Sequence, residues 1–499
     1  MNIAALVGSF HDATLAQLLR PALGFVLLTW LAVATYYLHF HPLARIPGPK
    51  IWILSRLPYI LVLRKGRLAV RLKELHDAYG SVVRVAANEV SFIDEKAWTD
   101  IYAYHQHYPL PKNPYWYRMR PNKAYGIMAS PNADHGRFRR TYAPVFTEKA
   151  VREQEPLILR HIETLIDQLK IEASKKAPTN IVNWFEYIAF DIVGDLSYSH
   201  SFDCLRKNDN RYQITIVQGS MKGFTLDASL RLLGVEKVKQ LYIPMISPKK
   251  QEKYYKTLNY WTQQRLAEGE RQQGNDLMKY ANLRTNKGLT LPETENSIGD
   301  MMIAGSETVA STLAAVFYHL TRSPSTYQDL AKDLRGKFNR QTEINITAVS
   351  DLPFLNAVIN EAMRLCPSLP MVMPRIVPEP GAHICGYWFP AGTQVSFCQL
   401  AAYSSPKNFS FPERFIPSRW LPTSTMKLHN AGVFHPFSVG QRNCIGKEFG
   451  LAEVRLILAK LLWSFDITAG EKDWDWNSQK TYHVWEKRPL FVNISPRGL

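Results

Sequence analysis

Apolar residues in this 499-residue chain form one run long enough to cross a membrane, followed by many segments with helical spacing. Residues 21–40 contain no Asp, Glu, Lys or Arg, and a helix of this length spans about 30 Å, the thickness of a bilayer core. Tyr36 and Tyr37, near the end of the run, suit the interface between lipid and water. The pattern predicts a transmembrane anchor helix at 21–40.

The charges on either side of this run predict its orientation. Residues 1–20 hold one acidic and one basic residue, whereas 45–74 hold eight basic residues and one acid. Because basic residues collect on the cytosolic side, we expect a short lumenal N-terminus at 1–20 and a cytosolic remainder. A cleaved signal peptide is the alternative, because residues 32–34 (Ala-Val-Ala) resemble a cleavage site, but the apolar run continues past them. Prolines and a glycine then predict a stiff, Pro-rich hinge at 41–50.

The remaining residues, 51–499, predict one large, mainly α-helical unit with small β-sheets. Residues 68–79 have the spacing of an amphipathic helix, and two short apolar stretches after it predict strands. Residues 298–320 are apolar on most faces, as in a helix that crosses the centre of a protein. Two segments rich in turn-forming or polar residues, 104–130 and 268–297, predict a long loop and an exposed connector.

The net charge of +17 and the five cysteines narrow the function classes. The basic residues are scattered and mixed with acids, so a nucleic-acid interface is not indicated. A membrane surface or an acidic redox partner suits this charge, and a merely soluble basic surface is the alternative. The cysteines are odd in number and include no Cys-x-x-Cys, so neither a disulfide framework nor a zinc site is predicted. That usage fits a reducing compartment.

One cysteine stands in a distinctive setting, the stretch Phe-Ser-Val-Gly-Gln-Arg-Asn-Cys-Ile-Gly at 437–446. A helical apolar run follows it, so Cys444 should lie just ahead of a helix N-terminus, where the dipole favours a thiolate. A thiolate is an axial ligand for heme iron. Gly440 and Gly446 would let the backbone pass close to a flat macrocycle, and Arg442 could pair with its carboxylates. A buried free cysteine is the alternative interpretation.

The spacing Phe-x-x-Gly-x-Arg-x-Cys-x-Gly resembles the heme-binding signature of the cytochrome P450 family, with every fixed position filled. The resemblance implies a cytochrome P450-like domain with heme b (iron protoporphyrin IX) as cofactor. It further implies that Cys444 is the metal ligand and that Phe437, Gly440, Arg442 and Gly446 bind the cofactor.

A second motif lies inside the buried helix, Ala304-Gly305-Ser306-Glu307-Thr308, and resembles the family's oxygen-activation motif. By this resemblance Gly305 would open a groove for dioxygen over the heme, and Glu307 and Thr308 would be the catalytic residues that deliver protons. The alternative is structural: the Thr308 hydroxyl bonds back to the preceding turn, and Glu307 takes part in a buried ion pair.

A third match is Glu-x-x-Arg, formed by Glu361 and Arg364 on a helix expected at 352–365. In the family an arginine of a Pro-Glu-Arg-Phe segment completes this pair, and here that arginine is Arg414. The resemblance implies a buried structural network of these three residues. A solvated ion pair of little energetic value is the alternative for Glu361 and Arg364 alone.

The same resemblance assigns further residues to the cofactor and the substrate. Arg375 follows the helix at the position of a propionate-binding arginine. Arg139 matches the arginine of the family's Trp-x-x-x-Arg, and His135 stands where the tryptophan usually is; a solvated basic face is the alternative for both. Segments implied to line the substrate pocket contain Tyr115, Trp116, Met119, Met371, Val372, Met373, Val484, Trp485 and Glu486.

Together these features predict a monooxygenase anchored by one transmembrane helix in the endoplasmic reticulum membrane, with its catalytic domain in the cytosol. It resembles fungal-type microsomal members, and we expect it to act on a lipophilic small molecule in secondary-metabolite biosynthesis. No dinucleotide site is visible, so NADPH–cytochrome P450 reductase is the implied partner. An enzyme that desaturates, couples or rearranges its substrate without oxygen insertion is the alternative, and a non-catalytic heme sensor is a weaker one.

Overall fold

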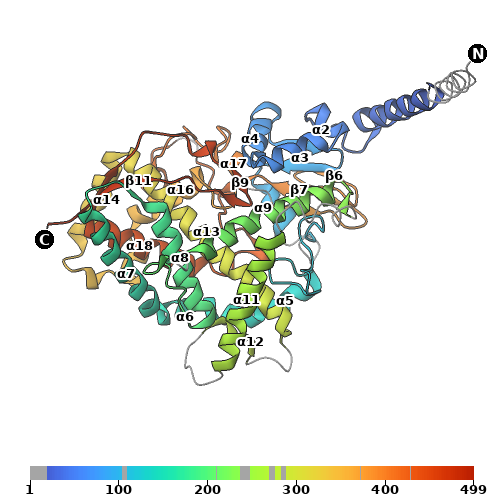
Figure 1. Ribbon diagram of the computed structural model, residues 1–499. Coiled ribbons are helices and arrows are strands. Elements are labelled where there is room, and N and C mark those ends of the chain that lie inside the picture. The colour runs from blue at the N-terminus through green and yellow to red at the C-terminus, as the bar shows by residue number, and fades with distance from the viewer. Residues whose placement is uncertain are drawn as a thin grey trace, which may run out of the picture.

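Figure 1 shows the computed structural model, which describes residues 20–103, 110–208, 211–236, 248–268, 276–282, 288–370, 373–426 and 429–498. The helical segment Arg20–Phe40 projects from the body of the protein. Its mean hydropathy is 1.6, and only 6% of it is buried. Leu291–Arg322 is also long and apolar enough to span a membrane, but 83% of it is buried, as in a core helix. The short N-terminus predicted at 1–20 lies almost wholly outside the described residues.

Helices form most of the body, as predicted. They are α2 (Lys50–Leu54), α3 (Leu57–Arg64), α4 (Leu68–Tyr79), α5 (Asn132–Tyr142), α6 (Glu148–Glu153), α7 (Glu155–Ser174), α8 (Ile181–Tyr198), α9 (Tyr212–Leu232), α11 (Pro248–Glu268), α12 (Leu277–Asn282), α13 (Leu291–Arg322), α14 (Pro324–Lys337), α15 (Ile346–Ser350), α16 (Pro353–Leu365), α17 (Gln399–Tyr403) and α18 (Lys447–Ser464).

The strands are short and form small sheets. They are β1 (Val82–Ala86), β2 (Glu89–Phe92), β3 (Thr179–Asn180), β4 (Arg375–Ile376), β5 (Ala382–Ile384), β6 (Tyr387–Phe389), β7 (Gln394–Phe397), β8 (Phe465–Ala469), β9 (Thr481–Tyr482), β10 (Val484–Trp485) and β11 (Phe491–Pro496). The largest sheet has the order β1-β2-β7-β4, in which β2 and β7 run parallel. A second sheet has the order β3-β11-β8, and the pairs β9–β10 and β5–β6 stand alone.

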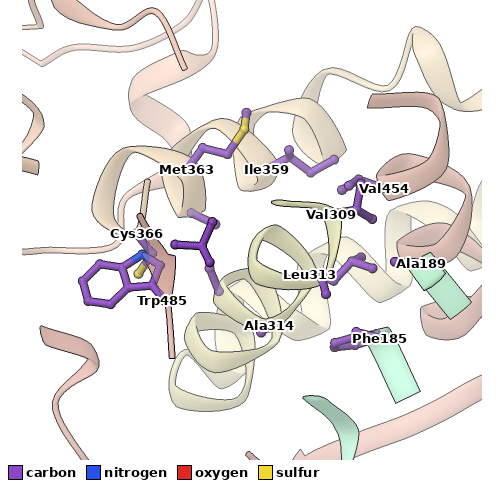
Figure 2. Close-up of a cluster of buried hydrophobic side chains, with 14 of the residues drawn as sticks. Phe185, Ala189, Val309, Leu313, Ala314, Ile359, Met363, Cys366, Val454 and Trp485 are labelled. Carbon is purple, nitrogen blue, oxygen red and sulfur yellow. The ribbon is translucent and has the colours of Figure 1, made fainter. Parts of the chain in front are cut away.

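The long helix α13 crosses the centre of the molecule. Its 32 residues span a length of about 48 Å. Its start is fixed by a capping box, because Thr290 accepts from the N–H of Glu293 and the Glu293 side chain accepts in return from Thr290. Figure 2 shows its side chains Val309 and Leu313 among residues of α8, α16 and α18. This packing confirms the buried central helix predicted from the apolar pattern.

Two predictions about the course of the chain have different outcomes. The helix predicted at 68–79 is α4, and Gly80 ends it with φ +102°, a conformation that favours glycine. The exposed connector predicted at 268–297 is wrong in part. Its middle forms α12, where Leu277 and Met278 are fully buried, and its last residues already belong to α13. The segment is polar overall, so its composition did not indicate that two apolar residues within it are buried.

The Pro-rich segment after the N-terminal helix lies against β1. The Arg84 N–H donates to the Pro47 carbonyl at 2.8 Å, and a Cβ on Gly48 would lie 2.0 Å from the Arg84 carbonyl oxygen. The buried guanidinium of Arg84 donates to the Tyr37 carbonyl at 2.8 Å. The end of the N-terminal helix is therefore attached to the body of the protein.

Candidate active site

The segment 437–446 folds into a tight turn that presents Cys444 ahead of α18. The Cys444 N–H donates to the Phe437 carbonyl at 2.8 Å and closes the turn. Gly440 has φ +73°, and a Cβ there would lie 2.4 Å from the Tyr102 carbonyl oxygen. Gly440 is thus required by contact with the backbone at Tyr102. A Cβ on Gly446 would make only ordinary contacts with Phe146, at 3.7 Å and beyond.

The Cys444 thiol lies deep in the fold yet keeps accessible surface, which indicates an opening beside it. Burial raises the pKa of this thiol, and the N–H of Gly446 with the charges of Arg139 and Lys447 offsets only part of that rise. The Gly446 N–H lowers the pKa of the thiol, which is the direction predicted for the helix N-terminus. The loss of hydration outweighs the dipole, so a thiolate here needs the charge of a bound metal.

Arg139 supports the cysteine segment from α5. Its guanidinium donates to the Asn443 carbonyl at 2.8 Å, to the Asn443 side chain at 2.6 Å and to the Gln441 carbonyl at 3.3 Å. These bonds fix the backbone just before Cys444. Direct binding of the cofactor by Arg139 stays a prediction, because its observed partners belong to the protein.

Four basic side chains gather near this turn, and three of them have nitrogens without a partner among the described residues. Arg442 donates to the Ser130 carbonyl at 2.7 Å, but its Nη1 has no hydrogen-bond partner among the described residues. The same holds for Nε and Nη1 of Arg375, which is 3% exposed, and for Nε2 of His135. Lys112, from the loop before α5, joins them through an isolated β-bridge to Arg375.

No ion pair joins these four basic side chains to an acid among the described residues. Burial lowers the pKa of Arg442 to about 10 and lowers that of Arg375. Burial also lowers the pKa of His135 to about 3, with Arg442, Lys112 and Arg139 acting in the same direction. Asp300, which acts on Lys112, is itself paired with Arg120. Arg375 and Arg442 are buried cations with free donors and require an anion, and the two propionates of a heme fit them.

The predicted oxygen-activation motif lies at the middle of α13, where the helix is less covered. Ala304 is exposed and Gly305 and Thr308 are half-buried, while the residues around them are buried. The Thr308 hydroxyl donates to the Ala304 carbonyl at 2.5 Å. A Cβ on Gly305 would meet the Val193 side chain of α8 at 3.1 Å, so this glycine also permits close helix packing.

Glu307 points away from this open stretch, into a buried ion pair. Lys487, which follows β10, places its Nζ 2.5 Å from the Glu307 carboxylate and 3.1 Å from that of Glu186 on α8. Although burial alone lowers the pKa of Lys487, the two carboxylates hold it well above its ordinary value. For both Thr308 and Glu307, the structure therefore contains the contacts of the structural alternative, and these contacts leave the Thr308 oxygen free to accept a proton.

The Glu361 network is buried, but one predicted member is wrong. Glu361 accepts from Arg364 at 2.8 and 2.9 Å and from Arg419 at 3.0 Å. Trp420 Nε1 and the Ile416 N–H, each at 2.9 Å, complete its shell. The Arg414 side chain is 68% exposed and gives the network only its carbonyl, which accepts from Arg364. The sequence offered two arginines five residues apart, and only the fold shows which one turns inward.

The segments predicted to line a substrate pocket differ in their surroundings. Tyr115 and Met119 are exposed and Trp116 is half-buried, in a loop that bonds to α13 at Asn296, Ser297 and Asp300. Trp485 is 1% exposed and donates to the Pro367 carbonyl at 2.8 Å, so it is a core residue (Figure 2). Met371 and Val372 lie outside the described residues.

Sequence reasoning missed three residues. Lys112 stands among aromatic and proline residues, and this isolation is its one signal. Lys487 lies between Glu486 and Arg488, and nothing local marked it. Arg419 was visible in the Pro-x-Arg-Trp that follows Arg414, but nothing local favoured it.

Comparison with known proteins gives consistent matches over nearly the whole chain. The family described as Cytochrome P450 matches residues 46–494. The cytochrome P450 monooxygenase lcsI of Purpureocillium lilacinum is 36% identical over 474 residues, covering 93% of this chain and 91% of that protein. The averantin hydroxylase of Dothistroma septosporum is 38% identical over 489 residues, covering 96% and 91%. The versicolorin B desaturase stcL of Emericella nidulans is 35% identical over 472 residues, covering 93% and 95%.

Proposed function

The chain belongs to the cytochrome P450 family, whose cofactor is heme b, and on that premise we propose that it inserts one atom of O2 into a lipophilic secondary metabolite. The protein is a monooxygenase by enzyme class, as are the relatives that it resembles. The observation that carries the proposal is the accessible thiol of Cys444 close to basic side chains that form no ion pair with an acid among the described residues. This arrangement suits a cofactor with one metal and two carboxylates.

Each residue then has a defined task. Cys444 would hold the iron, and Arg375, Arg442, His135 and Lys112 would hold the propionates. The bound heme supplies the reductive activation of dioxygen, which amino-acid side chains cannot provide. Thr308, at the uncovered middle of α13, would pass a proton toward the reacting oxygen through its hydroxyl, and Glu307 would return one to it. The loop before α5 would exclude water by staying attached to α13.

The cellular setting is part of the same proposal. Arg20–Phe40 would anchor the protein in the endoplasmic reticulum membrane by a single pass, with residues 51–499 in the cytosol. Support comes from its hydropathy, its low burial and the basic residues that follow it. Electrons would come from NADPH through a membrane-bound cytochrome P450 reductase, whose acidic face would suit the net charge of +17.

A second outcome of the same site is an oxidation without oxygen insertion. One relative is named as a desaturase, although it is as similar to this chain as the relatives named as monooxygenases. Desaturation uses the same heme, proton delivery and electron source, so the site residues alone do not separate the two products.

An isotope experiment tests the proposal. Membranes bearing the protein are incubated with reductase, NADPH, heavy-isotope O2 and a lipophilic extract of the source, and products are identified by mass spectrometry. We expect a product that carries one heavy oxygen atom and is lost in Cys444→Ser. The matched control Cys385→Ser alters a cysteine at the turn between β5 and β6 and should keep the product. A Cys444-dependent product without label supports desaturation, and no product contradicts the proposal.

A further inference from the structure

Trp116, His483 and Arg231 form a cluster of polar side chains to which the proposed heme site gives no task. Trp116 lies in the loop before α5, His483 at the turn between β9 and β10, and Arg231 near the end of α9, which runs beside β9 (Figure 1). The rings of Trp116 and His483 meet edge to face, with their centroids 5.6 Å apart. Burial lowers the pKa of His483 to about 4, and the nearby charge of Arg231 acts in the same direction. The three side chains therefore share one surrounding.

Two donors in this cluster lack an acceptor among the described residues. The Trp116 Nε1 and the Arg231 Nε are both buried, and neither has a hydrogen-bond partner there. The carboxylates of Asp227 and Glu236 act on the charge of Arg231, yet neither accepts from its Nε. Buried donors are nearly always bonded in native proteins, because an unpaired donor loses its hydration without compensation. Two unpaired donors in one cluster indicate that their acceptor belongs to a ligand.

His483 has a backbone conformation that is unusual for a residue with a side chain. Its φ is +72°, in the region that favours glycine, and it alone joins β9 to β10, since Tyr482 pairs with Val484. Strained residues of this kind gather at ligand-binding sites. The His483 side chain lies deep in the fold yet keeps accessible surface, which indicates an opening beside it. Because its pKa is low, the neutral ring offers this opening one donor and one acceptor.

The cluster adjoins the proposed heme site through Tyr117. The Lys112 Nζ lies 4.3 Å from the centre of the Tyr117 ring. Burial raises the pKa of Tyr117, and Arg375 and Arg442 offset part of that rise. Tyr117 is thus close to the basic residues that would hold the propionates, and Trp116 directly precedes it in the chain. A ligand that reaches Trp116 would therefore lie next to the heme.

The charges around Arg231 limit the kind of ligand. Arg118 is paired with Glu236, and Asp227 lies near Arg231, so two basic and two acidic side chains balance one another. A charged ligand would leave one charge without a counterpart, and such a charge is costly away from water. An uncharged oxygen accepts a hydrogen bond without this penalty. Carbonyl and phenol oxygens are acceptors of this kind.

We propose that Trp116, Arg231 and His483 recognise an uncharged acceptor oxygen, a carbonyl or a phenol, on an otherwise lipophilic substrate. The proposal rests on the proposed function, because it names the substrate class of that reaction. The substrate is then an oxygen-bearing compound, and the reaction that supplies it leaves a carbonyl or a phenol in place. A site that hydrogen-bonds a substrate oxygen discriminates strongly against the analogue without it, since its own donors stay unpaired there.

The binding of matched tricyclic probes tests the proposal without turnover. Fluorene carries no oxygen, fluorenone carries a carbonyl, hydroxyfluorene carries a phenol, and fluorene carboxylate carries a negative charge. Equilibrium dialysis against the heme-loaded, full-length protein gives the Kd of each probe. We expect fluorenone and hydroxyfluorene to bind about tenfold more tightly than fluorene, the effect of one net hydrogen bond. Fluorene carboxylate should bind no more tightly than fluorenone.

Substitutions assign this preference to the cluster. Trp116→Phe keeps an aromatic ring and removes the donor, and Arg231→Met keeps an unbranched side chain and removes the guanidinium. Trp388→Phe on β6 is the matched control, because it removes the donor of a tryptophan that is 50% exposed. The ferrous carbon monoxide spectrum checks in each variant that the thiolate-bound heme is in place. We expect the preference for fluorenone over fluorene to shrink to about twofold or less in Trp116→Phe and Arg231→Met, and to persist in Trp388→Phe.

Three results would overturn the recognition site. They are equal affinity of the wild type for fluorene and fluorenone, a wild-type preference in both cluster variants, and an equal loss of affinity for all four probes, which marks a structural role. Tighter binding of the carboxylate than of fluorenone would overturn the uncharged oxygen. If one cluster variant does not load heme, the other decides. A protein with the expected preference that forms no product in the isotope experiment would instead contradict the proposed function.

Discussion

Two arginines assigned to the same task by sequence resemblance have different surroundings in the fold. Arg139 directs its donors at the backbone before Cys444, whereas Arg375 has two donor nitrogens without a partner among the described residues. A donor that is already bonded to protein cannot be counted as a site for a carboxylate. The free donors of a side chain therefore indicate its ligand better than the motif that contains it.

The substitution Lys112→Met should stabilise the heme-free form of the protein and weaken the heme-loaded form. Burial lowers its pKa well below the ordinary value, with Arg375 and Arg442 acting in the same direction. Below about pH 10 the unfolded chain then binds more protons than the heme-free fold, so the stability of that fold rises with pH up to there. Lys112→Met should flatten this rise and stabilise the heme-free fold. Thermal unfolding from pH 6 to pH 9 measures it.

In the heme-loaded form, the same substitution removes a partner of the propionates. We expect Lys112→Met to weaken heme binding by about tenfold or more, the loss of one charge-assisted hydrogen bond. Transfer of heme to an acceptor protein measures the change. Arg71→Met on α4, which removes an exposed basic residue, is the control and should alter neither property. A Lys112→Met variant that destabilised the heme-free fold would contradict this account of the cluster.

Arg414 and Arg419 offer a matched comparison within five residues. Arg419→Ala should destabilise the protein by about 3–5 kcal/mol, because Glu361 would lose one of its two buried ionic partners. Arg414→Ala should change the free energy of unfolding by less than about 0.5 kcal/mol, since that side chain is exposed. Glu361→Ala should abolish heme incorporation. Denaturant unfolding and heme content measure these effects, and the reverse order of the two arginines would contradict the assigned network.

At the scale of elements, α13 connects the proposed heme site to the loop before α5. Asp300, in its first half, pairs with Arg120 and accepts from the Met128 N–H at 3.0 Å, and Ser297 accepts from Ile127 at 3.2 Å. These bonds attach the loop to a helix that is itself buried. These polar contacts add to the burial of Leu110 and Ile127, which attach the loop to the apolar core.

Asp300→Ala should loosen this loop without unfolding α13. Loss of a charged hydrogen-bond acceptor costs about 1–3 kcal/mol, so amide exchange at Met128 should become about tenfold faster or more. Hydrogen-exchange mass spectrometry of peptides covering 120–130 measures this. The control is Asp329→Ala on α14, an exposed acid that should leave the same peptides unchanged. Unchanged exchange in Asp300→Ala would show that other contacts hold the loop.

Local sequence patterns predicted the helices and their ends. Contacts between distant segments determined which side chains meet in the fold. The end of α4 at Gly80 and the central burial of α13 followed from spacing and composition alone. The inward turn of Arg419, the contact of Gly440 with Tyr102 and the pairing of Lys487 with Glu307 depend on segments far apart in the chain. No periodicity within one segment carries information about such partners. For this reason the cofactor signature was visible in the sequence and the partners of Glu307 were not.

At the scale of the molecule, the N-terminal helix contributes little to the packing that stabilises the body. Most side chains of Arg20–Phe40 contact no other part of the protein, whereas Tyr37 is held by Arg84. Apolar residues are also exposed just after the helix, at Ile51, Leu57 and Leu61. These lie on α2 and α3, which follow the attached end of the N-terminal helix.

Deletion of residues 1–34 should therefore release the protein from membranes only in part and leave its fold intact. We expect an unchanged free energy of unfolding, because the described part of the deleted segment, residues 20–34, is almost unburied. Sedimentation with vesicles should fall strongly but not to zero, since Ile51, Leu57 and Leu61 remain. Replacing these three by serine in the deleted form should abolish the residual binding. Full retention on vesicles after the deletion alone would contradict the role of the anchor.

The hydrogen bonds between the loop before α5 and strand β4 have a consequence for the life of the protein in the cell. The Ile376 N–H donates to the Pro111 carbonyl at 3.0 Å, and Lys112 lies beside Arg375. Since burial lowers the pKa of Lys112, an anion that restores its charge would add an ionic contact between the loop and the strand. Newly made chains without heme should thus expose the loop to proteases, and cofactor insertion should protect it. The same contact would then act as a maturation checkpoint, through which cells clear enzyme that was never loaded.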